Sequence, residues 1–381
     1  MRIRTVAAAA AVAGLVLVAC GSDDDSSSTA DTTAGSAAPA GSEAPAGSEA
    51  PAGSAAAGGD CVVGVSWNNF QEERWAKFDE PAIKAAIEAG GGSYVSNDAK
   101  SSAETQASNV ENLISQGANV LVILAQDGTA IKPSVEAATA AGVPVIAYDR
   151  LIEDPSTLYI TFDNVEVGRL QAETIFGLVP EGNYVIMKGN SADANADFLR
   201  SGMEEVIGDA VTAGDITIVG ETYTDNWDPA IAQTQMEQFL TAENNEVDAV
   251  LSENDGMAGG VIAALEAQGL AGQVPGSGQD GEVAALNRVA LGTQAVDVWK
   301  DARELGTAAG EAAIGLCANP DPASVAGTAP FTTPEGNELS TILLTPIPIT
   351  QDNLDVVVDA GWIDQETLCQ GVDAGSVAAC G

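Results

Sequence analysis

The chain has 381 residues, of which 55 are acidic and 14 are basic, so its formal net charge at pH 7 is −41. This acidic balance argues against nucleic-acid binding, which requires a basic surface. The sequence contains no histidine, so the most common general base and the most common zinc ligand are both missing. The length is typical of two domains with extensions, and the composition lowers the expectation of hydrolytic or metal-dependent chemistry without excluding carboxylate-based mechanisms.

Residues 1–20 have the composition of a secretory signal peptide. Arg2 and Arg4 precede an apolar run that is too short for a membrane-spanning helix. The run ends in Leu-Val-Ala-Cys-Gly, which resembles the lipobox of bacterial lipoproteins, where cleavage precedes the cysteine and the thiol is acylated. We therefore expect a lipid anchor on Cys20, against the simpler alternative of an ordinary signal peptide with an incidental cysteine.

Residues 21–60 consist almost entirely of Asp, Ser, Thr, Ala, Gly and Pro. The sequence Pro-Ala-Gly-Ser-Glu-Ala starts at Pro39 and again at Pro45, and it begins a third time at Pro51. Such a segment cannot bury a core, so we expect a disordered linker. About 40 flexible residues span roughly 35 Å, which is enough to hold a folded body away from a membrane.

From residue 61 onward, short apolar runs that stop in polar residues alternate with helix-like segments, as in buried parallel sheets. In the first series we expect strands at 62–67, near 94, at 120–125, 143–148 and 158–162, and helices at 73–89, 103–116 and 129–141. In the second series we expect helices at 165–178, 197–207, 229–241 and 256–268, and strands at 184–188, 216–221, 249–252 and 274–277; a further helix is expected at 301–316. Glycines stand where helices should end, at 90–92, 117, 142 and 269. The pattern predicts an α/β fold with two doubly wound parallel-sheet lobes, each built right-handed.

Four cysteines remain after Cys20, and an even number in an exported chain suggests two disulfides with three possible pairings. Cys61 begins the first expected strand, and Cys317 ends the expected helix at 301–316. Both positions belong to the face of the sheet opposite the ligand crevice. We therefore favour Cys61–Cys317, which leaves Cys369–Cys380 as a local loop.

Ligands of open α/β sheets bind at the carboxyl ends of the strands. No phosphate-binding glycine fingerprint follows a strand, so we expect no nucleotide and no cofactor. Of the 12 basic residues that remain after the signal peptide is removed, three stand at strand ends: Arg74, Arg150 and Lys300. Polar and aromatic neighbours accompany them, in Glu72–Trp75, Asp193–Asn195, Asp225–Trp227, Glu253–Asp255 and Gln279–Asp280. Carboxylates, amides and cations supply the acceptors and donors that sugar hydroxyls need, and aromatic rings cover the apolar face of a sugar.

These segments resemble the periplasmic sugar-binding proteins of ABC importers, and most of all the D-xylose-binding proteins. The motifs that carry the resemblance are Glu73-Arg-Trp75, Ala147-Tyr-Asp-Arg150, Asp163-Asn164, Gly182-Asn-Tyr184, Asn254-Asp255, Ser277-Gly-Gln-Asp280, Gly292-Thr-Gln294 and Leu343-Leu-Thr-Pro-Ile347. The resemblance covers about residues 62–365, essentially the whole folded part. The resemblance implies a type I fold with a three-stranded hinge, in which 61–163 plus 293–345 form an N-terminal lobe and 164–292 plus 346–381 form a C-terminal lobe and tail. The expected crossings lie near 163–164, 291–293 and 345–349.

The resemblance also assigns roles to individual residues. It implies hydrogen bonds to a pentose from Arg74, Asp149, Arg150, Asn195, Asn254, Asp280 and Lys300, a ring sandwich between Trp75 and Trp227, and a weaker candidate in Asp193. Ala194 departs from the second amide that xylose binders tend to carry there, which puts one contact or the sugar preference in doubt. No calcium-binding loop is present in the sequence, so no metal site is expected.

Structural alternatives exist for the same residues. Trp75 is a candidate core residue, Asp149 and Arg150 could form a structural ion pair, and Lys300 could be solvated. Asp193 and Asn254 could be helix caps. Three further tryptophans are interpreted as packing residues: Trp67, Trp299 and Trp362.

The resemblance implies a monomeric, lipid-anchored binding protein on the outer face of the cytoplasmic membrane, and no enzyme. It would deliver D-xylose to a permease; glucose, ribose and arabinose are alternative sugars. Two other functions stay open, a sugar-sensing module for a receptor or kinase and a carboxylate-based glycosidase. The interleaving of carboxylates with cations and amides suits holding a sugar better than cleaving it.

Overall fold

The computed structural model describes residues 61–381. The expected signal peptide (1–20), its acylated Cys20 and the linker (21–60) lie outside the described residues. Within residues 61–381, no helix is both long and apolar enough to cross a membrane.

The first lobe contains a seven-stranded sheet with the strand order β11-β12-β5-β4-β3-β1-β2. Its strands are β1 (Val62–Trp67), β2 (Ser93–Asp98), β3 (Val120–Ile123), β4 (Val145–Tyr148), β5 (Thr157–Phe162), β11 (Ala329–Thr332) and β12 (Glu338–Leu344). All neighbours pair in parallel except β11, which runs antiparallel to β12 at the edge. Because β1 lies inside the sheet, between β2 and β3, and the chain winds both ways from it, helices cover both faces.

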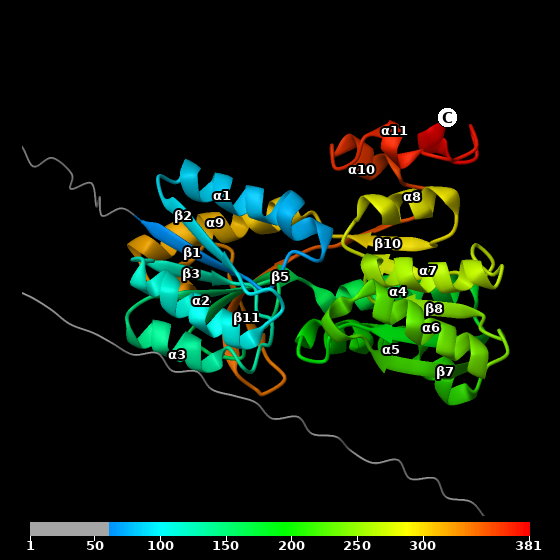
Figure 1. Cartoon of the computed structure of the whole chain (residues 1–381), viewed down its shortest axis with the longest axis horizontal. Coiled ribbons are helices and arrows are strands. Elements are labelled where there is room, and N and C mark those ends of the chain that lie inside the picture. The colour runs from blue at the N-terminus through cyan, green and yellow to red at the C-terminus, as the bar shows by residue number, and fades with distance from the viewer. Residues whose placement is uncertain (1–60) are drawn as a thin grey trace, which may run out of the picture. The chain divides into compact units, whose positions relative to one another are not determined.

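Four helices enclose this sheet: α1 (Glu80–Ala89), α2 (Ala103–Ser115), α3 (Lys132–Ala140) and α9 (Ala302–Ala318). Figure 1 shows α1 and α9 on one face and α2 and α3 on the other. Side chains of β3 point alternately to the two faces of the sheet. Val120 and Val122 pack in the core under α1 and α9, and Leu121 and Ile123 pack in the core under α2 and α3. This two-residue period explains why the whole strand is apolar.

The second lobe is built from two three-stranded sheets, β7-β6-β8 and β13-β10-β9. The strands are β6 (Gly182–Lys188), β7 (Ile216–Tyr223), β8 (Ala249–Ser252), β9 (Ser277–Gln279), β10 (Val296–Trp299) and β13 (Ile347–Ile349). An isolated bridge between Val250 and Gly276 connects them. The main helices are α4 (Asn164–Leu178), α5 (Ala194–Ala213), α6 (Pro229–Ala242), α7 (Asp255–Ala267) and α8 (Val283–Leu291).

Short helices complete the described chain: η1 (Trp75–Asp79, a π-helix), η2 (Asp225–Trp227), η3 (Pro322–Ser324), α10 (Asp355–Asp359), α11 (Gln365–Leu368) and η4 (Ala378–Cys380). The expected helix at 73–89 therefore begins as a π-helix turn, which is a common feature of functional sites. The expected strand at 274–277 lies at 277–279 instead. The glycines expected to end helices include Gly91, Gly117, Gly142 and Gly269, and all four have positive φ angles.

The pairing of β10 corrects the expected boundary between the lobes. β10 pairs in parallel with β9, so 296–299 lies in the second lobe, and the expectation that the first lobe resumes at 293 is wrong. The glycine that suggested a crossing, Gly292, instead ends α8 in a left-handed conformation. The chain crosses just after β10, at Lys300–Asp301, because α9 packs against α1 of the first lobe.

Two disulfides are present in the described chain. Cys61 bonds to Cys317, which connects the start of β1 with the end of α9, and Cys369 bonds to Cys380 within the C-terminal segment. This is the pairing favoured from the sequence. Trp67, Trp299 and Trp362 are buried in core clusters, which agrees with their interpretation as packing residues.

Candidate functional site

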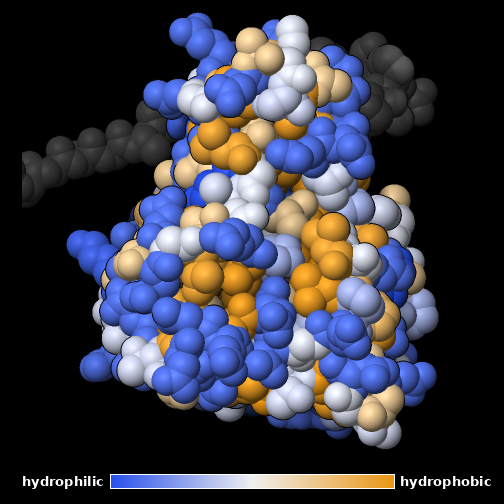
Figure 2. Space-filling model, turned by 90° about the vertical axis from the view of Figure 1, so that its right-hand side faces the viewer, coloured by the Kyte–Doolittle hydropathy of each residue, from blue (hydrophilic) through white to orange (hydrophobic). Residues whose placement is uncertain are grey.

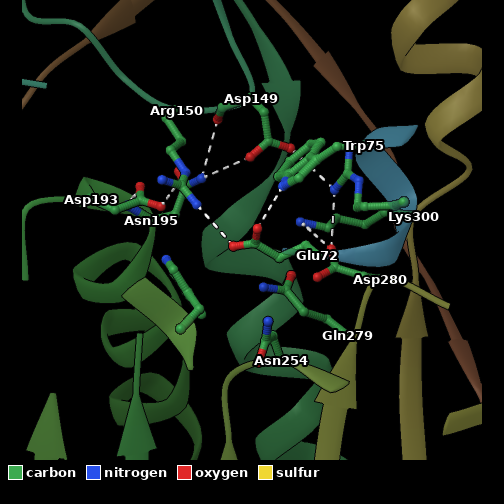
Figure 3. Close-up of a pocket in the computed structure, with 12 residues that line it drawn as sticks. Glu72, Trp75, Asp149, Arg150, Asp193, Asn195, Asn254, Gln279, Asp280 and Lys300 are labelled. Carbon is green, nitrogen blue, oxygen red and sulfur yellow. Dashed lines mark hydrogen bonds and ion pairs between the residues drawn. The ribbon is translucent and has the colours of Figure 1, made fainter. Parts of the chain in front are cut away.

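The polar strand ends of both lobes line one buried pocket (Figure 3). The first lobe contributes residues that follow β1 and β4, and the second lobe contributes residues that follow β6, β7, β8, β9 and β10. The pocket contains every site residue predicted from the sequence, namely Arg74, Trp75, Asp149, Arg150, Asp193, Asn195, Trp227, Asn254, Asp280 and Lys300, and it also contains Glu72 and Gln279.

Arg74 is the central cation of the first lobe. Its guanidinium is 2% exposed and lies 2.8 Å from Asp79, 3.2 Å from Asp149 and 3.1 Å from Asp280 of the second lobe. Beneath it, the Tyr148 hydroxyl also donates to Asp79. A buried guanidinium needs several carboxylate partners to offset its lost hydration, and Arg74 has them on both sides of the pocket.

Arg150 holds a second set of carboxylates, as Figure 3 shows. Its Nε lies 2.9 Å from Asp193 of the second lobe and its Nη2 lies 3.2 Å from Glu72. Asp149 and Arg150 therefore take different partners, and the alternative of a structural ion pair between these two neighbours is wrong. The positive φ of Asp149 (62°) turns its side chain towards Arg74 while Arg150 faces Asp193.

Lys300 and Asp280 form the charged pair of the second lobe. Their Nζ and Oδ1 atoms are 3.0 Å apart, and the Lys300 side chain is 3% exposed, so the alternative of a solvated lysine is wrong. Burial alone would raise the pKa of Asp280, but the charges of Lys300 and Arg74 outweigh burial and lower that pKa below its ordinary value. Asp280 thus remains an ionised acceptor at neutral pH.

Amides and helix caps complete the polar wall. Asp193 caps α5 and Asn254 caps α7, each by accepting a backbone N–H of the helix, so the expectation of a cap holds alongside their position in the pocket. Asn195 donates to the carbonyl of Asp149 at 3.2 Å, and its own oxygen accepts from Asn164 at 2.9 Å. These bonds fix the orientation of the Asn195 amide.

Two indoles line the pocket and also belong to the cores behind it. Trp75 is 3% exposed and Trp227 is 5% exposed. The Trp75 Nε1 donates to Glu72 at 2.8 Å, which fixes the plane of that ring. Trp227 packs directly over Gly189, where any side chain would overlap the indole. The core interpretation of Trp75 is therefore correct for part of the ring, and it does not conflict with a place in the pocket.

The charges and unpartnered atoms of the pocket indicate a polar, uncharged ligand. Four carboxylates (Glu72, Asp149, Asp193 and Asp280) face three cations, so the pocket has nearly balanced charge. Three buried polar atoms of the pocket residues, Asp149 Oδ2, Gln279 Oε1 and Trp227 Nε1, have no hydrogen-bond partner within residues 61–381. Buried polar atoms are normally satisfied, so a ligand with hydroxyl groups fits these positions. Among the described residues, no cluster of three or more acidic or cysteine side chains has the arrangement of a metal site.

Sequence reasoning missed Glu72 and Gln279 as pocket residues. Both belong to strand-end segments recognised from the sequence, and each stands one or two positions before a predicted contact. Only their position next to a predicted contact could have identified them from the sequence. Burial raises the pKa of Glu72, and the charge of Arg150 offsets only part of that rise.

Comparisons with known proteins agree with this geometry. Residues 63–320 match the family described as periplasmic binding protein domain. The chain is 39% identical over 309 residues to the D-xylose-binding periplasmic protein of Escherichia coli strain K12, across 80% of this chain and 92% of that protein. It is 32% identical to the multiple sugar-binding periplasmic receptor ChvE of Rhizobium radiobacter, across 81% of this chain and 92% of that protein.

Solved structures give the same picture. An ABC transporter solute binding protein from Clostridium phytofermentans with bound β-D-glucose has a TM-score of 0.73 and 26% identity, across 81% of this chain and 99% of that chain. These relatives are solute-binding proteins, and this chain is a solute-binding protein rather than an enzyme. The chain belongs to the periplasmic binding protein family, among the extracytoplasmic sugar-binding proteins of ABC transporters.

Proposed function

We propose that this protein captures D-xylose between its two lobes and delivers it to an ABC permease, while Cys20 anchors it by lipid to the outer face of the membrane. The observation that carries the proposal is the single buried pocket in which three cations, four carboxylates, three amides and two indoles converge from seven strand ends. The identity of 39% to a D-xylose-binding protein supports the choice of sugar.

The roles of the pocket residues follow from their chemistry. Asp149 and Asp280 accept from sugar hydroxyls, the two arginines and Lys300 donate to them, and Asn195 and Asn254 do either. Trp75 and Trp227 cover the apolar faces of the ring. Because the pocket side chains come from both lobes, binding favours the conformation in which the lobes meet.

Titration calorimetry against D-xylose, D-glucose, D-ribose, L-arabinose and xylitol tests the proposal. We expect the tightest binding for D-xylose. Asp280→Asn should weaken it by roughly 10- to 100-fold, since a hydrogen bond to a charged group contributes about 1.5–3 kcal/mol. Asp209→Asn, an exposed carboxylate on α5, is the matched control and should leave affinity unchanged. If none of these compounds binds, or if both variants behave alike, the proposal is wrong.

A further inference from the structure

The C-terminal segment touches both sides of the sugar pocket from outside. After β13, residues 350–381 form α10, α11 and η4, which lie beside α8 (Figure 1). Asn287 of α8 donates to the carbonyls of Leu368 and Gln370, at 2.8 and 2.9 Å, and the Cys369–Cys380 disulfide closes the segment. The segment is therefore firmly attached to the second lobe.

Trp362 of this segment holds the loop that carries Asp280. Its Nε1 donates to the carbonyl of Gly281 at 2.6 Å, and both groups are buried. Gly281 has a φ of +76°, and a side chain there would overlap Trp299 and reach Trp362. Asp280 itself has a φ of 104°, a conformation that costs energy unless its surroundings impose it. The Trp362 hydrogen bond holds the carbonyl of the next residue, Gly281, whose N–H donates to Asp255 and Asp297.

The same indole also contacts the first lobe. Its ring stacks on Phe78 with centroids 3.7 Å apart and planes 18° apart, and Phe78 lies on η1, the π-helix that begins with Trp75. From α9, Arg303 lies over the Trp362 ring at 5.2 Å and donates to the Ala360 carbonyl at 3.0 Å. One side chain thus connects the helix of Trp75 to the loop of Asp280.

We propose that Trp362 is a positioning residue for sugar binding. It fixes Asp280 through its hydrogen bond to Gly281, and it connects the second lobe to η1 through its contact with Phe78. The proposal rests on the proposed function, because it assigns Trp362 a part in holding the sugar. Trp362 does not line the pocket itself, so it acts through Asp280 and through the fit between the lobes.

The chain offers a matched control for the hydrogen bond. Trp299 is buried next to Trp362, with ring centroids 5.6 Å apart, but its Nε1 has no partner in the described chain. Trp362→Phe and Trp299→Phe both remove an indole N–H from the same core, and only the first removes a hydrogen bond.

We expect Trp362→Phe to weaken D-xylose binding about three- to tenfold, which is the effect of one lost neutral hydrogen bond, and Trp299→Phe to change it less than twofold. Phe78→Ala should raise the rate of sugar release several-fold with little change in the association rate, because loss of an interface contact acts mainly on dissociation. Equal sugar affinity of the two tryptophan variants, together with an unchanged release rate in Phe78→Ala, would overturn the proposal.

Hydrogen exchange separates this failure from failure of the proposed function. If the wild type binds no sugar, the proposed function fails. Amide hydrogen exchange of residues 279–283, measured without ligand, then tests whether Trp362 fixes the loop of Asp280. Faster exchange in Trp362→Phe than in Trp299→Phe supports it, and equal exchange overturns it. Unfolding measurements on each variant show that the comparison is made between folded proteins.

Discussion

Glu72 connects Trp75 and Arg150, two pocket side chains of the first lobe. One carboxylate oxygen accepts from the Trp75 indole at 2.8 Å and the other lies 3.2 Å from Arg150. Both bonds are buried, and a carboxylate in such a position fixes two side chains that line the pocket. Without it, the Trp75 indole would lose its hydrogen-bond acceptor, and Arg150 would keep Asp193 and the carbonyl of Ala125 as partners.

Glu72→Gln should therefore weaken sugar binding by roughly tenfold, since the isosteric amide removes the charge that holds Arg150. Glu73→Gln is the matched control, because Glu73 is the exposed neighbour and pairs only with Lys77 at 2.9 Å; its effect should stay below twofold. Titration calorimetry measures both. A Glu72→Gln protein with unaltered affinity would show that the positions of Trp75 and Arg150 are set by other contacts.

At the residue scale, the sequence predicted which side chains meet but not how they pair. Asp280 and Arg150 could be found because each follows a strand directly, and parallel strands end at one edge of a sheet. The pair of Arg74 with Asp280 spans 206 positions, and nothing in the spacing distinguishes this partner from Asp149. Those pairings depend on side-chain rotamers and on how the lobes meet.

At the scale of elements, the crossing of α4 and α5 positions one wall of the pocket. A side chain at Gly168 of α4 would overlap the carbonyl of Leu199, and one at Gly202 of α5 would overlap the carbonyl of Val165. The two backbones can lie this close only because both positions are glycine. The first residue of α4, Asn164, then reaches Asn195 of α5, so the packing of the two helices holds a pocket amide in place.

Gly168→Ala should accordingly lower the free energy of unfolding by about 1–3 kcal/mol, the cost of overpacking a close contact, and weaken sugar binding by shifting Asn195. Gly177→Ala on the same helix is the control. Its position is exposed with open space around it, so alanine should stabilise the helix by about 0.5–1 kcal/mol. Urea unfolding measures the two effects. If Gly168→Ala proves as stable as Gly177→Ala, α4 and α5 can separate without cost.

The sequence did not predict α8, and it placed β9 at 274–277 instead of 277–279. β9 is Ser-Gly-Gln, which has no apolar run, and it is a strand because it pairs with β10. The same pairing places the boundary between the lobes near residue 300, whereas the sequence analysis expected it at 293. Long apolar runs such as β3 and β6 could be predicted, because burial on both faces leaves a clear pattern.

At the scale of the whole molecule, the excess of carboxylates acts both on the surface and inside. Hydrophilic side chains cover most of the face shown in Figure 2, with smaller apolar groups between them. Inside the second lobe, burial raises the pKa of Glu282 from 4.5 to about 8, with added repulsion from Asp255 and Asp280 and a partial offset from Arg288. Burial likewise raises the pKa of Asp297 to about 7.

These raised pKa values predict how stability depends on pH. The folded protein keeps a proton on Glu282 from about pH 4.5 up to about 8, and one on Asp297 up to about pH 7, that the unfolded chain has already lost. Because the folded state binds more protons, the free energy of unfolding falls as pH rises through this window. The melting temperature should therefore be higher at pH 5.5 than at pH 8.5, by on the order of 5–10 °C.

Surface repulsion would give the same sign, so salt and a variant must separate the two causes. In 1 M NaCl the screening length is about 3 Å, which removes repulsion between exposed carboxylates and leaves the buried ones unaffected. Glu282→Gln removes a partly buried group that must ionise and should flatten the pH dependence in high salt, whereas exposed Asp209→Asn should not. Calorimetric melting at both pH values measures this. A slope that vanishes in salt for the wild type would assign the whole effect to the surface, and the buried carboxylates would then titrate as they do in the unfolded chain.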